Sequence, residues 1–443
     1  MAGYDDLATI RSELDRCMKC GNCQAVCPLY SELRKEAAAA RGKIRLVEAL
    51  LAGELALGGR LEDRLALCLT CGACSANCPS GVRFDRVILA ARTAAVRRRG
   101  LSPVKRLVFY GVLRHRRVFR GSLRAGRRLQ GLVRRPRFPI GLDRRRVVPA
   151  LARRTLLEEL PPVVRVPEAR WRVAYFAGCM NTYVYTGIGR SVVEVLAENR
   201  VEVVIPSTQH CCGIPVIVAG DQRLAREMAQ SNLGVFAGLQ VDALITSCST
   251  CVAAWRHHYP ELLPGEAHRT AAALARKTYD ISEFLVDVVG LRPPTSSLGV
   301  SVTYHDPCHL NRIAGVTRQP REILRAIPGV EFRELSDPGR CCGGAGSFSL
   351  SHYGLSMRVA AHKVKDIAGT GAAAVATGCP ACRMQLEDAL TQAGLAHPVR
   401  HVVELLAEAY RAERGGDSRG QDQVLTDPLD FLPPGPVRLP GRR

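Results

Sequence analysis

Short apolar runs alternate with amphipathic stretches between residues 172 and 376, and this alternation predicts an α/β fold. The runs are rich in Val, Ile, Leu and Ala, as buried strands are, and the stretches between them space their apolar positions as helices do. Alternating strands and helices indicate mostly parallel sheets. The predicted strands are 172–177, 201–205, 243–246, 300–304, 330–334 and 373–376, and the predicted helices are 189–199, 222–239, 321–327 and 355–369.

The order of elements occurs twice, and cysteines follow equivalent strands in both copies. Open α/β sheets bind their ligands just past the carboxyl ends of their strands, which is where these cysteines fall. Equivalent cysteines are separated by 129 to 131 positions. The first copy carries Cys179, Cys211, Cys212, Cys248 and Cys251, and the second carries Cys308, Cys341, Cys342, Cys379 and Cys382.

Each copy contains a Cys-Cys-Gly sequence, at 211–213 and at 341–343. Neighbouring cysteines rarely pair with each other, because a disulfide needs a defined torsion that a regular trans peptide does not offer. Two adjacent thiolates instead suit a site with more than one metal ion. The glycine that follows lets the backbone approach such a site without a Cβ clash. We therefore interpret the ten cysteines as a duplicated metal-binding unit.

Two further cysteine runs precede these copies. Residues 17–28 and 68–79 both read C-x2-C-x2-C-x3-C-P, the run of two-cluster bacterial-type ferredoxins. The fourth cysteine of such a run usually binds the other cluster. The predicted sites are Cys17, Cys20, Cys23 and Cys78 for one [4Fe-4S] cluster, and Cys68, Cys71, Cys74 and Cys27 for the other. A zinc ribbon is the alternative, and two identical four-cysteine runs argue against it.

The residues between the two runs are too many for a compact ferredoxin turn. Residues 37–51 are rich in Ala, Leu, Arg and Glu and hold no proline, so they are predicted to be helical. The tetrapeptide Arg41-Gly42-Lys43-Ile44 lies inside this helix. It is either a feature of helical dicluster ferredoxins or a helix surface with a packing glycine.

The positive charge of the chain is concentrated in one segment. The formal net charge is +21, and residues 97–154 hold 20 Lys and Arg against one acid, Asp143. Apolar residues from Val104 to Phe119 recur there at roughly helical spacing, a pattern typical of a basic amphipathic helix on an anionic membrane surface. An acidic partner subunit and a solvated linker are the alternatives. Nucleic acid is not expected, because aromatic residues are scarce and no binding module is recognisable.

The composition excludes several classes of protein. No apolar run is long enough for a transmembrane helix, and residues 1–16 lack the apolar core of a secretory signal. Eighteen cysteines without export indicate metal or redox chemistry in a reducing compartment, and we expect a cytoplasmic protein, peripheral on the membrane if the basic segment binds lipid. No dinucleotide fingerprint or phosphate loop follows a strand. The chain therefore carries one-electron centres without a hydride carrier, and an organic substrate implies a separate flavoprotein.

Taken together, these motifs resemble a known family. The two copies are similar to the cysteine-rich CCG domain of heterodisulfide reductase subunits and of glycolate and lactate dehydrogenase iron–sulfur subunits. With the ferredoxin in front, nearly the whole chain resembles the glycolate oxidase iron–sulfur subunit family. The sequences at 78–83, 304–309 and 341–346 fit this resemblance. In the relatives, a complete five-cysteine set holds a noncubane [4Fe-4S] cluster, which implies two such clusters here, with zinc as an alternative in one.

The resemblance implies an oxidoreductase subunit that is inactive alone. It would pass electrons from an FAD-binding 2-hydroxy-acid dehydrogenase to a quinone or another carrier, and a membrane quinone-reactive subunit is a second expected partner. The alternative is a heterodisulfide reductase-like subunit whose CCG clusters reduce disulfides. The anchor-type subunit of anaerobic glycerol-3-phosphate dehydrogenase is a related option, and a metal store or redox sensor fits the dicluster ferredoxin poorly. The catalytic residues are left unassigned.

The expected architecture is α+β and multidomain, a helical dicluster ferredoxin followed by two α/β CCG units. His305 and His309 flank Cys308, and His210 precedes Cys211. They could carry protons or donate hydrogen bonds to a cluster, but packing or capping is the expected role. The predicted parts are a ferredoxin domain at 1–100, a basic linker at 101–165, CCG domains at 166–292 and 293–411, and a disordered tail at 412–443 that is rich in Gly, Pro, Arg and Asp.

Overall fold

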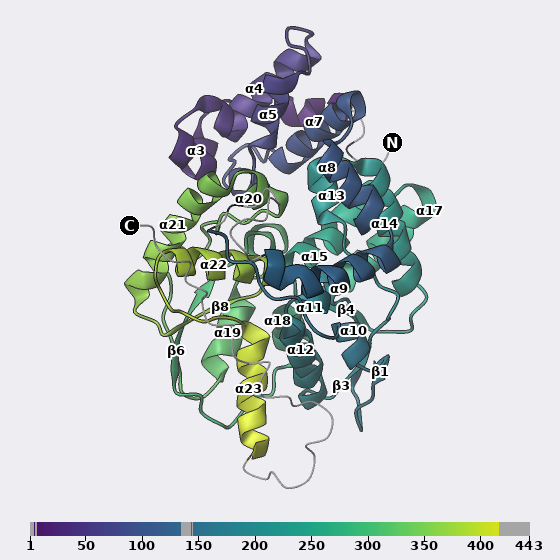
Figure 1. Cartoon of the computed structure of the whole chain (residues 1–443), viewed down its shortest axis with the longest axis vertical. Coiled ribbons are helices and arrows are strands. Elements are labelled where there is room, and N and C mark those ends of the chain that lie inside the picture. Colours follow the sequence, from purple (N-terminus) through teal and green to yellow (C-terminus); the bar gives the residue numbers. More distant parts are fainter. Residues whose placement is uncertain (1–3, 5–6, 134–142, 144, 416–443) are drawn as a thin grey trace.

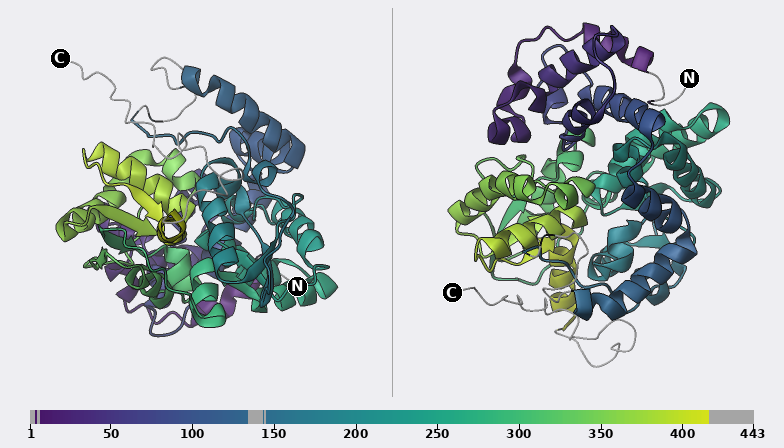
Figure 2. Two further views of the ribbon diagram at one scale, coloured as in Figure 1. Left: turned by 90° about the horizontal axis from the view of Figure 1, so that it is seen from below. Right: turned by 45° about the horizontal axis from the view of Figure 1, so that its top comes forward.

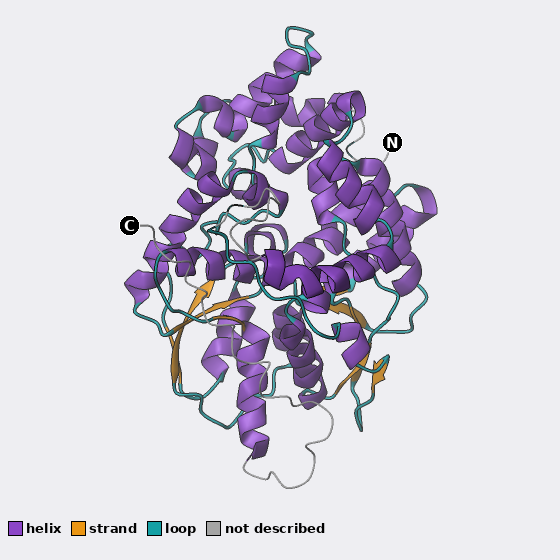
Figure 3. Cartoon of the chain, viewed as in Figure 1, coloured by secondary structure: helices purple, strands orange, loops and turns teal. Residues whose placement is uncertain are grey.

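The computed structural model describes residues 4, 7–133, 143 and 145–415. A helical ferredoxin unit lies across one end of the molecule, and the two α/β copies stand side by side beneath it (Figures 1 and 2). The strands of both copies lie in the half away from the ferredoxin unit (Figure 3). The predicted fold class, a helical dicluster ferredoxin followed by two α/β units with mostly parallel sheets, is confirmed.

The ferredoxin unit is built from short helices around its two cysteine runs. The predicted helix at 37–51 is divided in two, because Ala39 is extended at φ −83° and ψ 166°. Its elements are η1 (Leu7–Ile10), α1 (Arg11–Asp15), α2 (Asn22–Ala25), α3 (Pro28–Leu33), η2 (Glu36–Ala38), α4 (Ala40–Leu51), α5 (Gly59–Ala66), α6 (Ala73–Ala76) and α7 (Phe84–Arg99).

The basic segment is helical over much of its length and leads from the ferredoxin unit along the first copy (Figure 1). Phe109 and Leu113 are buried, whereas Val104, Leu107 and Val108 are exposed. Among the described residues, no helix has the length and apolarity that a membrane span would need. The elements are α8 (Pro103–Arg106), the π-helical η3 (Leu107–Leu113), α9 (Arg116–Val133) and α10 (Leu156–Glu159).

The first copy holds a five-stranded sheet in the order β1-β3-β2-β4-β5. Its β1–β3 pair is antiparallel, and the other strand pairs are parallel. Its elements are β1 (Val163–Val164), β2 (Trp171–Tyr175), α11 (Gly178–Tyr183), α12 (Thr186–Glu198), β3 (Val201–Val204), α13 (Ile214–Ala219), α14 (Gln222–Phe236), β4 (Ala243–Thr246), α15 (Ser249–Ala253), η4 (Ala254–His258), α16 (Tyr259–Leu262), α17 (Gly265–Arg276), β5 (Thr278–Asp280), α18 (Ile281–Glu283) and η5 (Phe284–Val289).

The second copy holds a four-stranded parallel sheet in the order β7-β6-β8-β9. This order repeats that of β3-β2-β4-β5, so the duplication seen in the cysteines extends to the sheet. Its elements are β6 (Val300–His305), η6 (His309–Ile313), α19 (Arg318–Ala326), β7 (Val330–Phe332), α20 (Ser347–Ser351), α21 (Tyr353–Thr370), β8 (Ala374–Thr377), α22 (Pro380–Gln392), β9 (Val399–His401) and α23 (Val402–Gly415).

One hydrophobic core joins the two copies. Helices α12 and α23 lie next to each other between the two sheets (Figure 1), and buried residues of both copies, such as Val192 and Leu406, belong to the same cluster. The hydroxyl of Tyr185 donates to Glu387 at 2.6 Å across this boundary. The tail predicted from residue 412 overlaps α23 up to Gly415, and residues 416–443 lie outside the described residues.

Candidate metal centres

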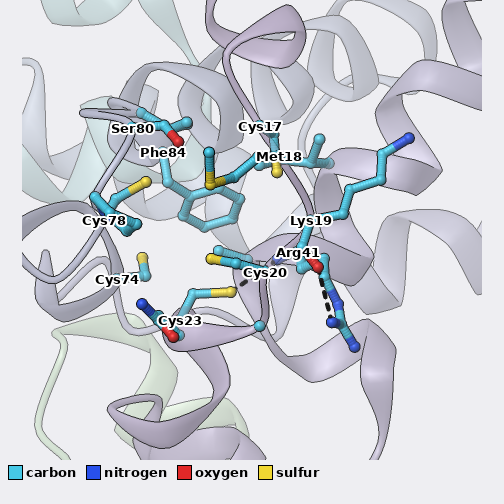
Figure 4. A pocket seen from close by; sticks show the side chains of 16 residues that line it. Cys17, Met18, Lys19, Cys20, Cys23, Arg41, Cys74, Cys78, Ser80 and Phe84 are labelled. Carbon is cyan, nitrogen blue, oxygen red and sulfur yellow. Dashed lines mark hydrogen bonds between the residues drawn. The ribbon is translucent and has the colours of Figure 1, made fainter.

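The first ferredoxin set, defined as Cys17, Cys20, Cys23 and Cys78, surrounds one cavity. The four thiols line a space of about 410 Å³, and Cys74 lies in its wall (Figure 4). Cys20 is exposed and its neighbour Met18 is 68% exposed, so this set lies at the protein surface. Three of these cysteines come from the first run and one from the second, as the spacing predicts. Their role as ligands stays a prediction.

The second ferredoxin set, defined as Cys27, Cys68, Cys71 and Cys74, lines a neighbouring space of about 490 Å³. Here the first run supplies one cysteine and the second run supplies three. This set lies deeper, and burial raises the pKa of Cys71 to about 12 and that of Cys74 well above its ordinary value. Thiols in such surroundings stay protonated unless a metal takes the place of the proton.

The Arg41-Gly42-Lys43 sequence fixes the backbone around both ferredoxin sets. Arg41 donates from its side chain to the carbonyl of Lys19 at 3.0 Å and from its backbone N–H to the sulfur of Cys23 at 3.4 Å (Figure 4). Lys43 is buried and donates to the carbonyls of residues 37 and 38. Gly42 packs so closely on the backbone of Glu36 that a Cβ would clash there. Both interpretations of the tetrapeptide therefore apply, since it packs a glycine and supports the cysteine loops.

Arg92 is a second buried cation near these cysteines, and no sequence motif indicated it. Its guanidinium donates to the carbonyl of Cys68 at 2.9 Å, and also to those of Leu65 and Ala66. A further bond reaches the carbonyl of Val218 in the first copy at 3.0 Å. One side chain thus fixes the loop of the second ferredoxin set and attaches it to the first copy. Only the burial of an arginine on α7 points to this role.

In the first CCG set, the five thiols of Cys179, Cys211, Cys212, Cys248 and Cys251 form a hydrogen-bonded chain. Cys179 bonds to Cys211, Cys212 bonds to both Cys211 and Cys251, and Cys251 bonds to Cys248. Bonds donated by Cys211 and Cys251 lower the pKa of Cys212, whereas the bond that Cys179 donates to Cys211 and burial raise that of Cys179. All five cysteines follow strand ends, as predicted, and two of them, Cys179 and Cys251, lie in the first turns of α11 and α15.

The second CCG set, Cys308, Cys341, Cys342, Cys379 and Cys382, repeats this chain member by member. Cys308 bonds to Cys341, Cys342 to Cys341 and Cys382, and Cys382 to Cys379. The hydrogen bond from Cys308 lowers the pKa of Cys341. The structure therefore brings together both five-cysteine groups that the sequence placed together.

The four sets form a series from the surface to the interior. The two ferredoxin sets share the wall at Cys74. Cys71 of the second ferredoxin set belongs to one buried cluster with Cys341 of the second CCG set, and Arg312 on η6 donates to the carbonyl of Cys71 at 3.3 Å. Cys379 of the second CCG set belongs to one buried cluster with Cys248 and Cys251 of the first, and its sulfur lies 3.9 Å from the hydroxyl of Thr250. The second CCG set thus contacts both the second ferredoxin set and the first CCG set.

The donors in these sets fit iron–sulfur clusters. All 18 cysteines are free thiols, and they converge in groups of four and five rather than pairing as disulfides. Cysteine thiolates in such numbers are the ligands of iron–sulfur clusters, and four of them also bind zinc. Eight of the eighteen cysteines are buried, seven of them in the CCG sets, and burial removes competing water from these; Cys20 is exposed and the others are half-buried.

The three histidines near the CCG sets differ in their surroundings. His210 lies against the basic segment, with its ring 6.4 Å from that of Phe119, and His309 places Nε2 3.4 Å from the carbonyl of Thr70. Both positions agree with the packing role expected for them. His305 is buried, and neither ring nitrogen has a hydrogen-bond partner in the described part of the chain. The sequence alone did not distinguish it from the other two.

Two buried side chains that hold the Cys-Cys-Gly loops, here called the loop clamps, were not identified from the sequence; they are Asn232 and Lys363. Asn232 on α14 accepts from the N–H of His210 at 2.9 Å and donates to the carbonyl of Cys211 at 3.0 Å. Lys363, at the equivalent position of α21, donates to the carbonyls of Asp337 and Pro338. A buried polar residue on the helix after each loop, 131 positions apart in the two copies, was the signal that could have identified them.

Comparison with known proteins agrees with this arrangement. The model of the 4Fe-4S dicluster domain matches residues 13–82, and that of the cysteine-rich CCG domain matches 173–255 and 302–387. The probable glycolate oxidase iron-sulfur subunit of Bacillus subtilis is 29% identical over 90% of this chain and 94% of its own length. A subunit of the dihydromethanophenazine:CoB–CoM heterodisulfide reductase of Methanosarcina mazei is 28% identical over 90% of this chain and 95% of its own length.

A shorter relative is more similar over the part that it shares. Lactate utilization protein A of Halalkalibacterium halodurans is 32% identical over 54% of this chain and 98% of its own length. The dicluster cysteine runs, the two CCG copies and these similarities agree with one another. The chain belongs to the glycolate oxidase iron–sulfur subunit family, and it joins a 4Fe-4S dicluster domain to two cysteine-rich CCG domains.

Proposed function

We propose that this chain is the electron-transfer subunit of a flavin-dependent 2-hydroxy-acid dehydrogenase, with glycolate or D-lactate as the substrate class. The observation that carries the proposal is the unbroken series of cysteine sets from the exposed Cys20 to the buried first CCG set. Iron–sulfur clusters supply one-electron transfer when bound at such sets. A 2-hydroxy acid loses two electrons, so a partner that carries FAD must accept them and release them singly.

The chain itself holds each cluster and controls its surroundings. The two ferredoxin sets would hold one [4Fe-4S] cluster each, and each CCG set would hold a noncubane [4Fe-4S] cluster. Lys43 and Arg92 place positive charge and hydrogen bonds beside the second ferredoxin set, and Lys363 places positive charge beside the second CCG set. Positive charge favours the reduced, more negative state of a cluster, so these residues raise the potentials of the groups next to them.

The direct test is to purify the native complex anaerobically at low salt and to identify its partners by mass spectrometry. An FAD-binding 2-hydroxy-acid dehydrogenase that co-purifies would support the proposal and name the substrate class. Substrate oxidation should then require both chains. A complex that lacks any flavoprotein and oxidises no 2-hydroxy acid would contradict it.

A second candidate is disulfide reduction at the CCG sets. The two sets are in contact, because Cys379 shares a buried cluster with Cys248 and Cys251 and its sulfur lies 3.9 Å from the hydroxyl of Thr250. Cleavage of a disulfide takes two electrons and two protons and releases two thiols, so adjacent one-electron centres suit it. The relative from Methanosarcina mazei is a heterodisulfide reductase subunit. Dye-linked disulfide reduction by the isolated, iron-loaded chain would favour this candidate, and inertness without a flavoprotein would favour the first.

We also propose that the basic segment binds the cytoplasmic face of an anionic membrane, where a quinone-reactive partner subunit can accept electrons. Val104 and Leu107 are 72% and 69% exposed, and Lys105 and Arg106 lie between them in the sequence. Each basic residue near such a surface contributes about 1 kcal/mol. The variant Val104→Asp/Leu107→Asp should lose binding to anionic vesicles, whereas Leu350→Asp, which changes an exposed leucine of the second copy, should retain it. Equal binding by both variants would contradict the proposal.

A further inference from the structure

His305 occupies a position that differs between the two otherwise similar CCG copies. It is the last residue of β6, three residues before Cys308. The equivalent residue of the first copy is Phe176, three residues before Cys179. Phe176 is buried among aromatic rings, with ring centres 5.7 Å from Phe236 and 5.5 Å from Trp255. The two copies therefore carry a hydrocarbon ring and an imidazole at matched positions.

The imidazole of His305 faces the sulfur atoms of the second CCG set. One of its ring nitrogens and the Sγ atoms of Cys342 and Cys382 all lie within 4.8 Å of one another. The side chain is 1% exposed, and both ring nitrogens lack hydrogen-bond partners among the residues that the structure describes. A buried polar group without a partner costs about 1–3 kcal/mol, so an arrangement of this kind indicates that a bound group completes it.

The position of the ring suits a metal ligand. In the described part of the chain neither ring nitrogen has a hydrogen-bond partner, and one of them faces the two sulfur atoms, so its lone pair is available to a bound metal group. Imidazole nitrogen binds iron and zinc alongside cysteine sulfur in other metal centres.

We propose that the second CCG copy is a mixed-donor metal site in which a ring nitrogen of His305 binds the metal group together with cysteine sulfur, whereas the first copy binds its group through sulfur alone. This inference rests on the proposed iron–sulfur function of the CCG sets. Replacement of thiolate by neutral imidazole raises the potential of an iron–sulfur centre. The two copies would then hold centres of unequal potential, with the higher one next to the ferredoxin.

The test is pulsed electron paramagnetic resonance on the full chain, loaded anaerobically with iron and sulfide and poised at a series of potentials. Protein grown with 15N-histidine should show a directly coordinated nitrogen whose coupling changes with the isotope. The coupling should disappear in His305→Phe, which installs the residue of the first copy. It should persist in His309→Gln, which alters the histidine on the other side of Cys308. The midpoint potential of one centre should fall in His305→Phe only.

Two results would overturn the proposal. One is the absence of any coordinated histidine nitrogen in the wild-type chain at every potential, a measurement that needs no variant to fold. The other is a coupling that survives in His305→Phe with the metal content unchanged. Neither result bears on the proposed function, because iron loading and co-purification with a flavoprotein are measured separately.

Discussion

The two CCG copies share a sheet order and a cysteine pattern, yet their surroundings differ at matched positions. In the first copy Phe176, Asn232 and Asp280 are apolar, neutral and acidic, respectively. Their counterparts in the second copy are His305, Lys363 and His401. The second copy also contacts the ferredoxin loop through η6, whereas the first contacts it through Arg92. The two copies thus share the arrangement of their cysteines, and they differ in the residues that surround those cysteines.

The largest difference in stability between matched variants of the two copies is expected at the glycines that follow the cysteine pairs. Gly343 and Gly213 both have a positive φ, of 84° and 79°. A Cβ at Gly343 would also clash with the carbonyl of Ser356, whereas a Cβ at Gly213 would meet Met228 at an ordinary 3.6 Å. Gly213→Ala should cost about 1–2 kcal/mol of strain, and Gly343→Ala about 3–5 kcal/mol because the backbone must also move.

The measurement is the midpoint of urea unfolding for both variants, made anaerobically on the iron-loaded chain. Gly343→Ala should also retain less iron than Gly213→Ala. Equal costs for the two substitutions would show that the closer packing of the second loop does not distinguish the copies.

The matched residues Asp280 and His401 should give the two copies opposite dependence on pH. Both are fully buried at the end of the last strand of their sheets. Burial raises the pKa of Asp280 to about 7, so the folded chain holds this proton more tightly than the unfolded chain does. The stability that Asp280 contributes is present at low pH and is lost as the pH rises towards 7, by up to about 4 kcal/mol.

For His401 the dependence of stability on pH has the opposite sign. Burial lowers its pKa to about 4, so its contribution is present above the ordinary histidine pKa and is lost as the pH falls towards 4. Unfolding midpoints between about pH 4 and pH 8 check both signs. Asp280→Asn should reduce the loss of stability that occurs as the pH is raised, and His401→Asn should reduce the loss of stability that occurs as the pH is lowered. A change of the same sign in both variants would disprove the assignment.

A smaller effect is expected at the two loop clamps. Lys363→Asn installs the first-copy residue, which is too short to reach the carbonyls of Asp337 and Pro338. Each carbonyl keeps a backbone N–H partner, from Arg340 and Asp306 respectively, so the cost is that of the lost charge-assisted bonds, about 1–3 kcal/mol. The loss of positive charge should lower the midpoint potential of the second CCG centre and leave that of the first unchanged. Redox titration of the chain measures this, with Asn232→Ala as the control. A shift of equal size at both centres would show that Lys363 acts through the whole fold rather than locally.

Much of this molecule follows from its sequence, because repetition and spacing carry most of the signal. The 129- to 131-residue offset predicted two equivalent α/β units, and the crossed pattern of the ferredoxin runs predicted which cysteines share a cavity. Cysteine loops just past strand ends converge whenever the strands are parallel, so their grouping could be predicted without coordinates.

The contacts between the units could not be predicted in the same way. No pattern in the sequence indicates that Cys248 meets Cys379 or that Arg312 reaches the loop of Cys71, because these contacts depend on how separate domains dock. The break at Ala39 and the roles of Arg92, Asn232 and Lys363 depend on tertiary packing as well. The sequence alone also provided no reason to compare Phe176 with His305. The difference between them points to different metal sites only because both rings are buried at matched positions.

In the proposed path, the second CCG set links the ferredoxin to the first CCG set. Freeze-quench electron paramagnetic resonance of the iron-loaded chain after mixing with a one-electron reductant tests it most directly, with Cys341→Ser/Cys342→Ser compared with Cys211→Ser/Cys212→Ser. Iron analysis confirms that each variant lacks only its own group. The first variant should reduce its ferredoxin clusters at the wild-type rate while its first CCG centre stays oxidised, and the second variant should still reduce its second CCG centre. Reduction of the first CCG centre at the wild-type rate in the first variant would show that electrons do not pass through the second CCG set.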